Sequence, residues 1–120
     1  MSLLRSTIGL TTIAVAVLFA QSGEQASVKE AALKKSLLTL RHAIDKYTAD
    51  ERKAPQTLHD LVTKNYVESI PADPMTGSDS TWRVVIEDAA KSADSSEPGI
   101  FDVHSGSDGV SSGGTRYADW

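Results

Sequence analysis

Asp102, His104 and Ser105 are the residues of this chain whose types and spacing could support catalysis. They supply the acid, base and nucleophile of a hydrolase triad, but a triad is recognised by geometry and not by proximity in the sequence. Adjacent strand residues point to opposite faces, so Asp102 and His104 can pair while Ser105 points elsewhere. Two more histidines, His42 and His59, lie on separate predicted helices without metal-ligand spacing. We therefore expect a surface pair of Asp102 and His104 and no enzymatic activity.

The segment after residue 104 is the second candidate site, because it is rich in Gly, Ser, Asp and Thr until Tyr117 and Trp120. A free segment of this composition is disordered, since it cannot bury enough apolar surface. A calcium loop has a similar composition, because calcium takes carboxylates and main-chain carbonyls at flexible geometry. The spacing of an EF-hand is not present. The composition leaves two interpretations open: a loop wrapped around a hard cation, or a segment without a cation in which Asp108 makes a turn by itself.

The composition sets further limits on the function. A chain of 120 residues predicts one domain. The formal charge of −4, with mixed signs, argues against a nucleic-acid partner, which requires a basic patch. The chain has no cysteine, which excludes disulfides, thiolate zinc sites and cysteine nucleophiles.

An apolar run at residues 7–20 follows Arg5. It is shorter than the roughly 20 residues that a bilayer span needs. It suits the apolar core of a secretory signal, with cleavage after Ala20 or Ser22. Residues 1–22 are then a signal peptide, and residues 23–120 form the folded domain.

Two helices are predicted before the sheet. Ser27 and Glu30 fit a capping box after a break at Gly23, so the first helix is expected at residues 27–50. Its apolar stripe recurs at helical spacing: Val28, Leu33, Leu37, Leu40, Ile44 and Tyr47. A short second helix follows Pro55, with Thr57 as its cap and Asp60 three residues later. The apolar face of that helix consists of Leu58, Leu61, Val62 and Tyr66.

Two strands are predicted at residues 81–87 and 100–104. Alternation places Trp82, Val84 and Ile86 on one face of the first strand, and Phe101 and Val103 on one face of the second. Before them, Pro71 and Pro74 forbid a helix, so Pro71, Asp73 and Pro74 are expected to form a structural turn. The expected fold is α+β: a long N-terminal helix packed on a small antiparallel sheet, with a short second helix and a C-terminal loop. The sheet and the C-terminal loop together occupy residues 81–120.

Three motifs in this order carry a family resemblance: KAPQTLHDL at residues 53–61, Tyr66, and IPADP at residues 70–74. Over residues 28–120 the chain resembles the major pseudopilin of type II secretion systems, a member of the type IV pilin-like superfamily. The resemblance implies a helical spine that carries a small sheet, and a loop after the last strand that often holds calcium.

The resemblance also implies a set of calcium ligands. Asp108 matches the family's ligand aspartate, while Ser105 and Val110 match residues that provide main-chain carbonyls. Relatives usually have an acidic residue near positions 112–113, where this chain has Ser and Gly. Asp119 is the candidate to replace it.

The N-terminus departs from the family pattern. Gly9 and Leu10 resemble the start of a mature pilin, but the glutamate that helps to dock a subunit into the filament is replaced by Ala14. Residues 1–22 are therefore interpreted either as a cleaved signal, as a degenerate prepilin anchor, or as a trimmed N-terminus. In the filament interpretation the assembly surface includes Leu10, Ala14, Val28 and Ala31.

The function that the resemblance implies is a non-enzymatic structural subunit of a periplasmic filament for type II protein secretion. Its partners would be further copies of itself, other pseudopilins and the secretion machinery of the bacterial inner membrane, with no nucleic acid and no small-molecule substrate. The protein is expected to be periplasmic or exported, and anchored in the inner membrane if residues 1–22 are retained. The alternative is a soluble exported pilin-like binding module that forms no filament.

Overall fold

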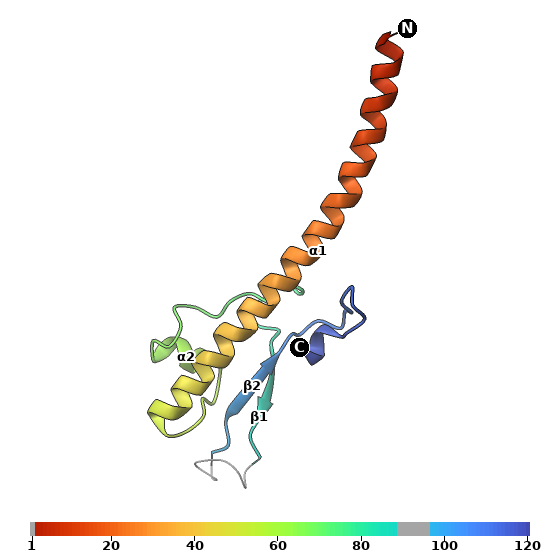
Figure 1. The fold of residues 1–120 in the computed structure, drawn as a ribbon. Coiled ribbons are helices and arrows are strands. Elements are labelled where there is room, and N and C mark those ends of the chain that lie inside the picture. The colour runs from red at the N-terminus through yellow and green to blue at the C-terminus, as the bar shows by residue number, and fades with distance from the viewer. Residues whose placement is uncertain (1, 89–96) are drawn as a thin grey trace.

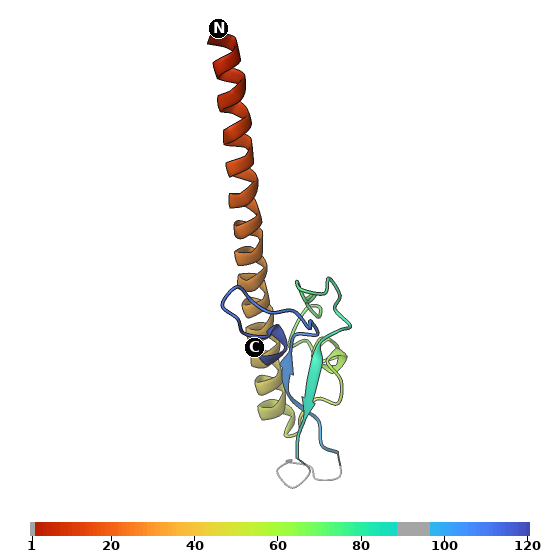
Figure 2. The same ribbon diagram turned by 90° about the vertical axis from the view of Figure 1, so that its right-hand side faces the viewer.

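The computed structural model describes the main chain of residues 2–88 and 97–120, and the side chains of residues 26–88 and 97–120. Helix α1 spans Ser2–Glu51 and helix α2 spans His59–Thr63. Strand β1 spans Arg83–Ile86, strand β2 spans Ile100–His104, and a 3-10 helix, η1, spans Tyr117–Asp119. The C-terminal half of α1 lies along β2, with β1 beyond it (Figures 1 and 2). The predicted α+β fold of a long helix on a small antiparallel sheet is confirmed.

Helix α1 is longer than the sequence predicted. The predicted start near residue 27 is wrong, because α1 begins at Ser2 and continues through Gly23. A glycine inside a helix costs only about 1 kcal/mol relative to alanine. Because the helix continues on both sides of Ser27, the amides that follow Ser27 donate to carbonyls of the preceding turn. They need no cap from the Ser27 side chain. At about 1.5 Å per residue, 50 residues span about 75 Å, close to the chain's longest dimension of 80 Å.

The apolar stripe of α1 forms the core, as predicted, from Leu33 onward. Leu33, Leu40 and Ile44 are fully buried. They meet side chains from α2, from the sheet and from the residue before β1: Leu61, Trp82, Ile100 and Val103. Val28, at the N-terminal end of the stripe, lies outside this core, since 66% of its surface is exposed. The folded domain therefore covers α1 only from about Leu33, one and a half turns after Val28.

The predicted capping box of α2 is present. The Asp60 amide donates to Thr57 Oγ1 at 3.3 Å, and the Thr57 amide donates to Asp60 Oδ2 at 3.1 Å. Asn65, with φ at 65°, reverses the chain just after the helix. Tyr66 follows this turn and its ring lies 5.3 Å from that of Tyr47, so the end of α2 is attached to α1.

A bulge in the sheet overturns one predicted alternation. Val85 lies opposite Asp102 but Ile86 lies opposite Ile100, which leaves Phe101 as an extra residue in β2. An extra residue shifts the alternation of the strand. The prediction that Phe101 and Val103 share a face is therefore wrong: Val103 is fully buried and Phe101 is exposed.

The burial of β1 also differs from the prediction. Trp82 is buried in the core, as expected, but Val84 and Ile86 are 41% and 50% exposed. Because α1 packs on β2 and β1 lies on the far side of β2, the side chains of β1 reach the core only in part (Figures 1 and 2).

Candidate functional site

The turn at residues 71–78, which we call the Asp73 turn, lies beside the end of the sheet. The Asp73 amide donates to the Ser78 carbonyl at 2.9 Å, and the Gly77 amide donates to the Asp73 carbonyl at 2.7 Å. Gly77 has φ at 77°, in the left-handed region that suits glycine. The indole of Trp82 donates to the Pro71 carbonyl at 2.8 Å, which attaches the turn to the core.

The carboxylate of Asp73 has no exposed surface and is fully engaged by donors. Oδ2 accepts from the Ser105 hydroxyl at 2.7 Å and from the Gly106 amide at 2.9 Å. Oδ1 accepts from the Met75 amide at 2.9 Å. Charge-assisted bonds of this kind are stronger than neutral ones. Asp73 thus joins its own turn to the start of the segment that follows β2.

Gly106 allows the two segments to meet because it has no side chain. A Cβ added at Gly106 would collide with the carbonyl group of Thr81. Only glycine lets the two main chains approach so closely. The composition around Gly106 predicts a loop but carries no signal for this contact.

The predicted calcium ligands lie in separate surroundings. Asp108 pairs with Arg83 through Oδ1 at 2.6 Å, and this hydrogen bond and charge lower the pKa of the Asp108 carboxyl. Ser105 is buried, whereas Val110 is exposed and forms an isolated bridge with Arg116. Asp119 lies on η1 with an exposed side chain.

Among the described residues, no three His, Cys, Asp or Glu side chains lie close enough to hold a metal ion together. Calcium also binds main-chain carbonyls, and a site with one or two carboxylates does not require such a group. Calcium at Asp108 therefore stays a prediction, and the ion would have to compete with the Arg83 guanidinium for the carboxylate.

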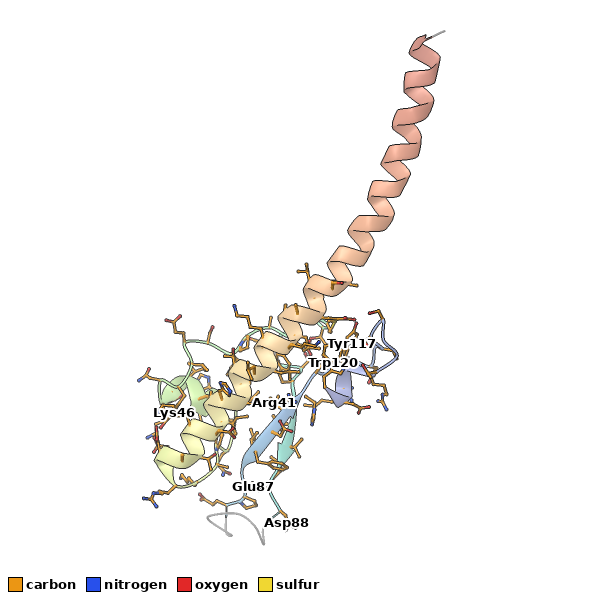
Figure 3. The ribbon with its side chains drawn as sticks, viewed as in Figure 1. Arg41, Lys46, Glu87, Asp88, Tyr117 and Trp120 are labelled. Atoms are coloured by element: carbon orange, nitrogen blue, oxygen red, sulfur yellow. The ribbon has the colours of Figure 1, made fainter. Side chains whose placement is uncertain are left out.

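The end of the C-terminal segment, residues 105–120, is held against α1 (Figure 3). The Tyr117 hydroxyl donates to Glu30 Oε1 at 2.9 Å. This bond, together with partial burial, raises the pKa of Tyr117. Lys34 Nζ lies 5.1 Å from the ring of Trp120, within cation–π range. Tyr117 and Trp120 thus attach the segment, as their positions suggested.

Arg41 of α1 forms hydrogen bonds to both strand β2 and the C-terminal segment. Its Nε donates to Asp102 at 2.8 Å, and one terminal nitrogen donates to the main-chain oxygens of Val103 at 2.8 Å and Trp120 at 2.6 Å. Partial burial works to raise the pKa of Asp102, but hydrogen bonds from the Val103 amide and Arg41 outweigh it and lower the pKa. No local pattern in the sequence indicates this role for Arg41.

The residues considered for catalysis are engaged in structural contacts. His104 Nε2 lies 3.6 Å from Asp102 Oδ2, and His104 Nδ1 lies 2.9 Å from the main-chain oxygen of Trp120. The Ser105 hydroxyl donates to Asp73. Asp102 and His104 thus face each other, while the Ser105 hydroxyl is directed to Asp73, so the three side chains do not form the relay that a hydrolase needs.

The predicted assembly residues lie along α1. Val28 and Ala31 are exposed. Leu10 and Ala14 lie in the part of α1 outside the described side chains. That part of the helix extends well away from the rest of the chain (Figures 1 and 2). Within the described residues, no helix is both long and apolar enough to cross a membrane.

Comparison of the chain with protein-family models, with curated proteins and with solved structures found no significant match.

Proposed function

We propose that this chain is a non-enzymatic structural subunit, similar to a major pseudopilin, that assembles through the N-terminal half of α1. The observation that carries the proposal is the extension of α1: the helix begins at Ser2, whereas its first buried side chain in the described part is Leu33. The main chain of the N-terminal half of α1 extends away from the rest of the domain (Figures 1 and 2).

A helix in this position needs another partner. Most helical stability in proteins comes from packing of an apolar face and not from local propensity. Residues 7–20 are apolar, so water is an unfavourable environment for them. Neighbouring helices or a lipid phase would supply the missing contacts, as in a filament anchored in the inner membrane.

The folded half is suited to a passive role. Asp102, His104 and Ser105 take part in contacts that hold the C-terminal segment. In the assembly that we propose, the domain is carried on the outside of a bundle of α1 helices. Function then resides in surfaces that meet further copies, other pseudopilins and the secretion machinery.

Ala14 sets the strength of this assembly. A carboxylate at this position would meet the N-terminal amine of a neighbour, and such contacts are strong where the dielectric constant is low. Ala14 cannot make the contact. We expect weak assembly of the chain alone and stronger assembly with a partner subunit that supplies the charge.

Calcium binding by the C-terminal segment is part of the same proposal. Asp108 would provide the carboxylate, Ser105 and Val110 would provide carbonyls, and Asp119 would provide a second carboxylate. Calcium that binds only the folded state raises the melting temperature with the logarithm of its concentration. An equal melting temperature in chelator and in millimolar calcium would rule this site out.

Disulfide crosslinking tests the assembly, because the chain has no native cysteine. Single cysteines are placed in the apolar run, as in Ile13→Cys, and on an exposed loop of the domain, as in Asp79→Cys. In membranes that contain the native partners, Ile13→Cys should form dimers on oxidation and Asp79→Cys should not. Monomers at every position tried between residues 7 and 28 would refute assembly through α1.

One observation favours the alternative function, a soluble exported binding module. Every residue of the hydrophobic core in the described part of the chain lies at Leu33 or later. Cleavage after Ser22 would therefore remove no described core residue. A mature protein that starts at residue 23 would retain the folded domain and lose the assembly helix.

A further inference from the structure

Strand β1 has an open edge within the described residues. In the described part of the chain the sheet has two strands, so β1 pairs with β2 on one side only. Both ribbon views place β1 on the far side of β2 from α1 (Figures 1 and 2). An open edge presents unpaired main-chain donors and acceptors and is a template for another strand.

The main-chain groups on this edge can be assigned. The Glu87 amide donates to the Gly99 carbonyl at 2.8 Å, on the side of β2. Main-chain groups alternate between the two sides of an antiparallel strand. Because the extra residue of the bulge is in β2, β1 keeps this alternation. The amides and carbonyls of Val84 and Ile86 therefore point to the open edge.

The sequence of the edge, RVVIE at residues 83–87, is complementary to itself. If a second copy pairs antiparallel with its centre at Val85, Arg83 of each copy lies opposite Glu87 of the other. Val84 then lies opposite Ile86 in hydrogen-bonded pairs that use the outward main-chain groups. Opposite charges across strands stabilise a sheet, as do paired β-branched residues.

The same register extends the apolar face of the sheet. Val84 lies opposite Val103, and Ile86 lies opposite Ile100, so all four share one face. Val103 and Ile100 are buried, whereas Val84 and Ile86 are substantially exposed. Pairing would place Val84 of one copy beside Ile86 of the other and continue the apolar row across the junction.

We propose that two copies of the chain form a homodimer through the open edge of β1. The two sheets then form one four-stranded antiparallel sheet, and the two-fold axis passes between the two Val85 residues. Arg83 already contacts Asp108 and Glu87 accepts from the Gly99 amide. A guanidinium has five donors and a carboxylate accepts several bonds, so the new pairs add to these contacts.

This dimer is distinct from the assembly through α1 and does not depend on it. Strand β1 and α1 run in similar directions in both views (Figures 1 and 2). The two-fold axis therefore directs the α1 helices of the two copies oppositely. In an assembly whose α1 helices all run in the same direction, such a pair cannot be embedded side by side, so edge pairing would hold its subunits apart from that assembly.

Cysteine at Val85 tests the axis directly in the full chain in mild detergent. Val85 faces itself in a non-hydrogen-bonded pair, where Cα atoms lie about 4.5 Å apart, within the range of a disulfide. Val84 is more exposed but lies opposite Ile86, so its two copies are too far apart to be bridged. Val85→Cys should form a covalent dimer on mild oxidation and Val84→Cys should stay monomeric.

Charge reversal provides the second test, with the dimer measured by sedimentation. Arg83→Glu or Glu87→Arg alone should weaken the dimer about tenfold, because each creates two like-charge pairs. The double reversal should restore it, although it cannot restore the Arg83–Asp108 contact within one copy. Variants are compared only if their melting temperatures match the parent.

Three results would overturn the proposal: Val85→Cys that stays monomeric, Val84→Cys that crosslinks equally well, or a double reversal that remains as weak as the single ones. Capture of another protein by Val85→Cys in place of a second copy would also overturn it.

Discussion

Asp73 and Asp108 are two aspartates in loops near the same end of the sheet, and their surroundings are opposite. Asp73 has no exposed surface and accepts from two segments of the chain. The side chain of Asp108 is 88% exposed and pairs with Arg83. A buried donor that loses its acceptor destabilises the fold, whereas water can hydrate the partners of a broken surface ion pair. The first aspartate is therefore structural, while the second forms an ion pair on the surface.

The largest effect should come from removal of the buried carboxylate. Asp73→Ala leaves the Ser105 hydroxyl and the Gly106 and Met75 amides without their acceptor. We expect a loss of about 3–5 kcal/mol in the free energy of unfolding. Chemical denaturation of the full chain measures it. A loss similar to that of Asp108→Ala would contradict the contrast between the two loops.

A core substitution measures how much apolar packing contributes to the stability of the fold. Leu40 is fully buried in the centre of the α1 stripe. Leu40→Ala should cost about 2–5 kcal/mol, from lost burial and a residual cavity. Leu38→Ala on the exposed face of α1 is the matched control and should change stability little. If both melts equal that of the parent, α1 does not organise the core.

Gly106 tests whether the approach of the two main chains matters separately from the Asp73 carboxylate. Gly106→Ala places a methyl group against the Thr81 carbonyl, and the loop must shift. We expect a loss of about 1–3 kcal/mol in unfolding free energy. Gly113→Ala has room for its methyl group and should be neutral or slightly stabilising. Equal effects at both glycines would mean that the close approach has no energetic role.

The smallest effect should follow from Asp108→Ala in chelator, which should leave the denaturation midpoint unchanged within error. Arg83 lowers the pKa of Asp108 below its ordinary value of 3.8. The pair therefore stabilises the fold above that pH, and the stabilisation is lost as pH falls through the folded-state pKa. NMR titration should show the lowered pKa, and Arg83→Met should return it towards 3.8. No change on Arg83→Met would show that the pair does not form.

The sequence was a good guide where one element carries the whole signal. Leu33, Leu37 and Leu40 repeat at helical spacing, so one helix pattern suffices to place them in the core. The Thr57–Asp60 capping box joins residues only three positions apart in the sequence and was also predictable. Local signals of this kind do not depend on the rest of the fold.

Long-range contacts were not predictable for the opposite reason. Asp73 and Ser105 are 32 residues apart in the sequence, so nothing near Asp73 announces its burial. No residue type near Phe101 marks the bulge in the sequence, yet the bulge changes the alternation expected for β2. The predicted start of α1 is wrong because Gly23 and the Ser27 box resemble a helix boundary, although the helix continues through both.

In the function that we propose, the N-terminal half of α1 remains in the mature protein and provides its assembly surface. Intact-mass spectrometry of the protein from its native envelope tests this most directly. We expect a mature chain that retains the apolar run at least from Leu10 onward. A mature chain that begins at Gln21 or Gly23 would contradict the filament proposal and support the soluble module.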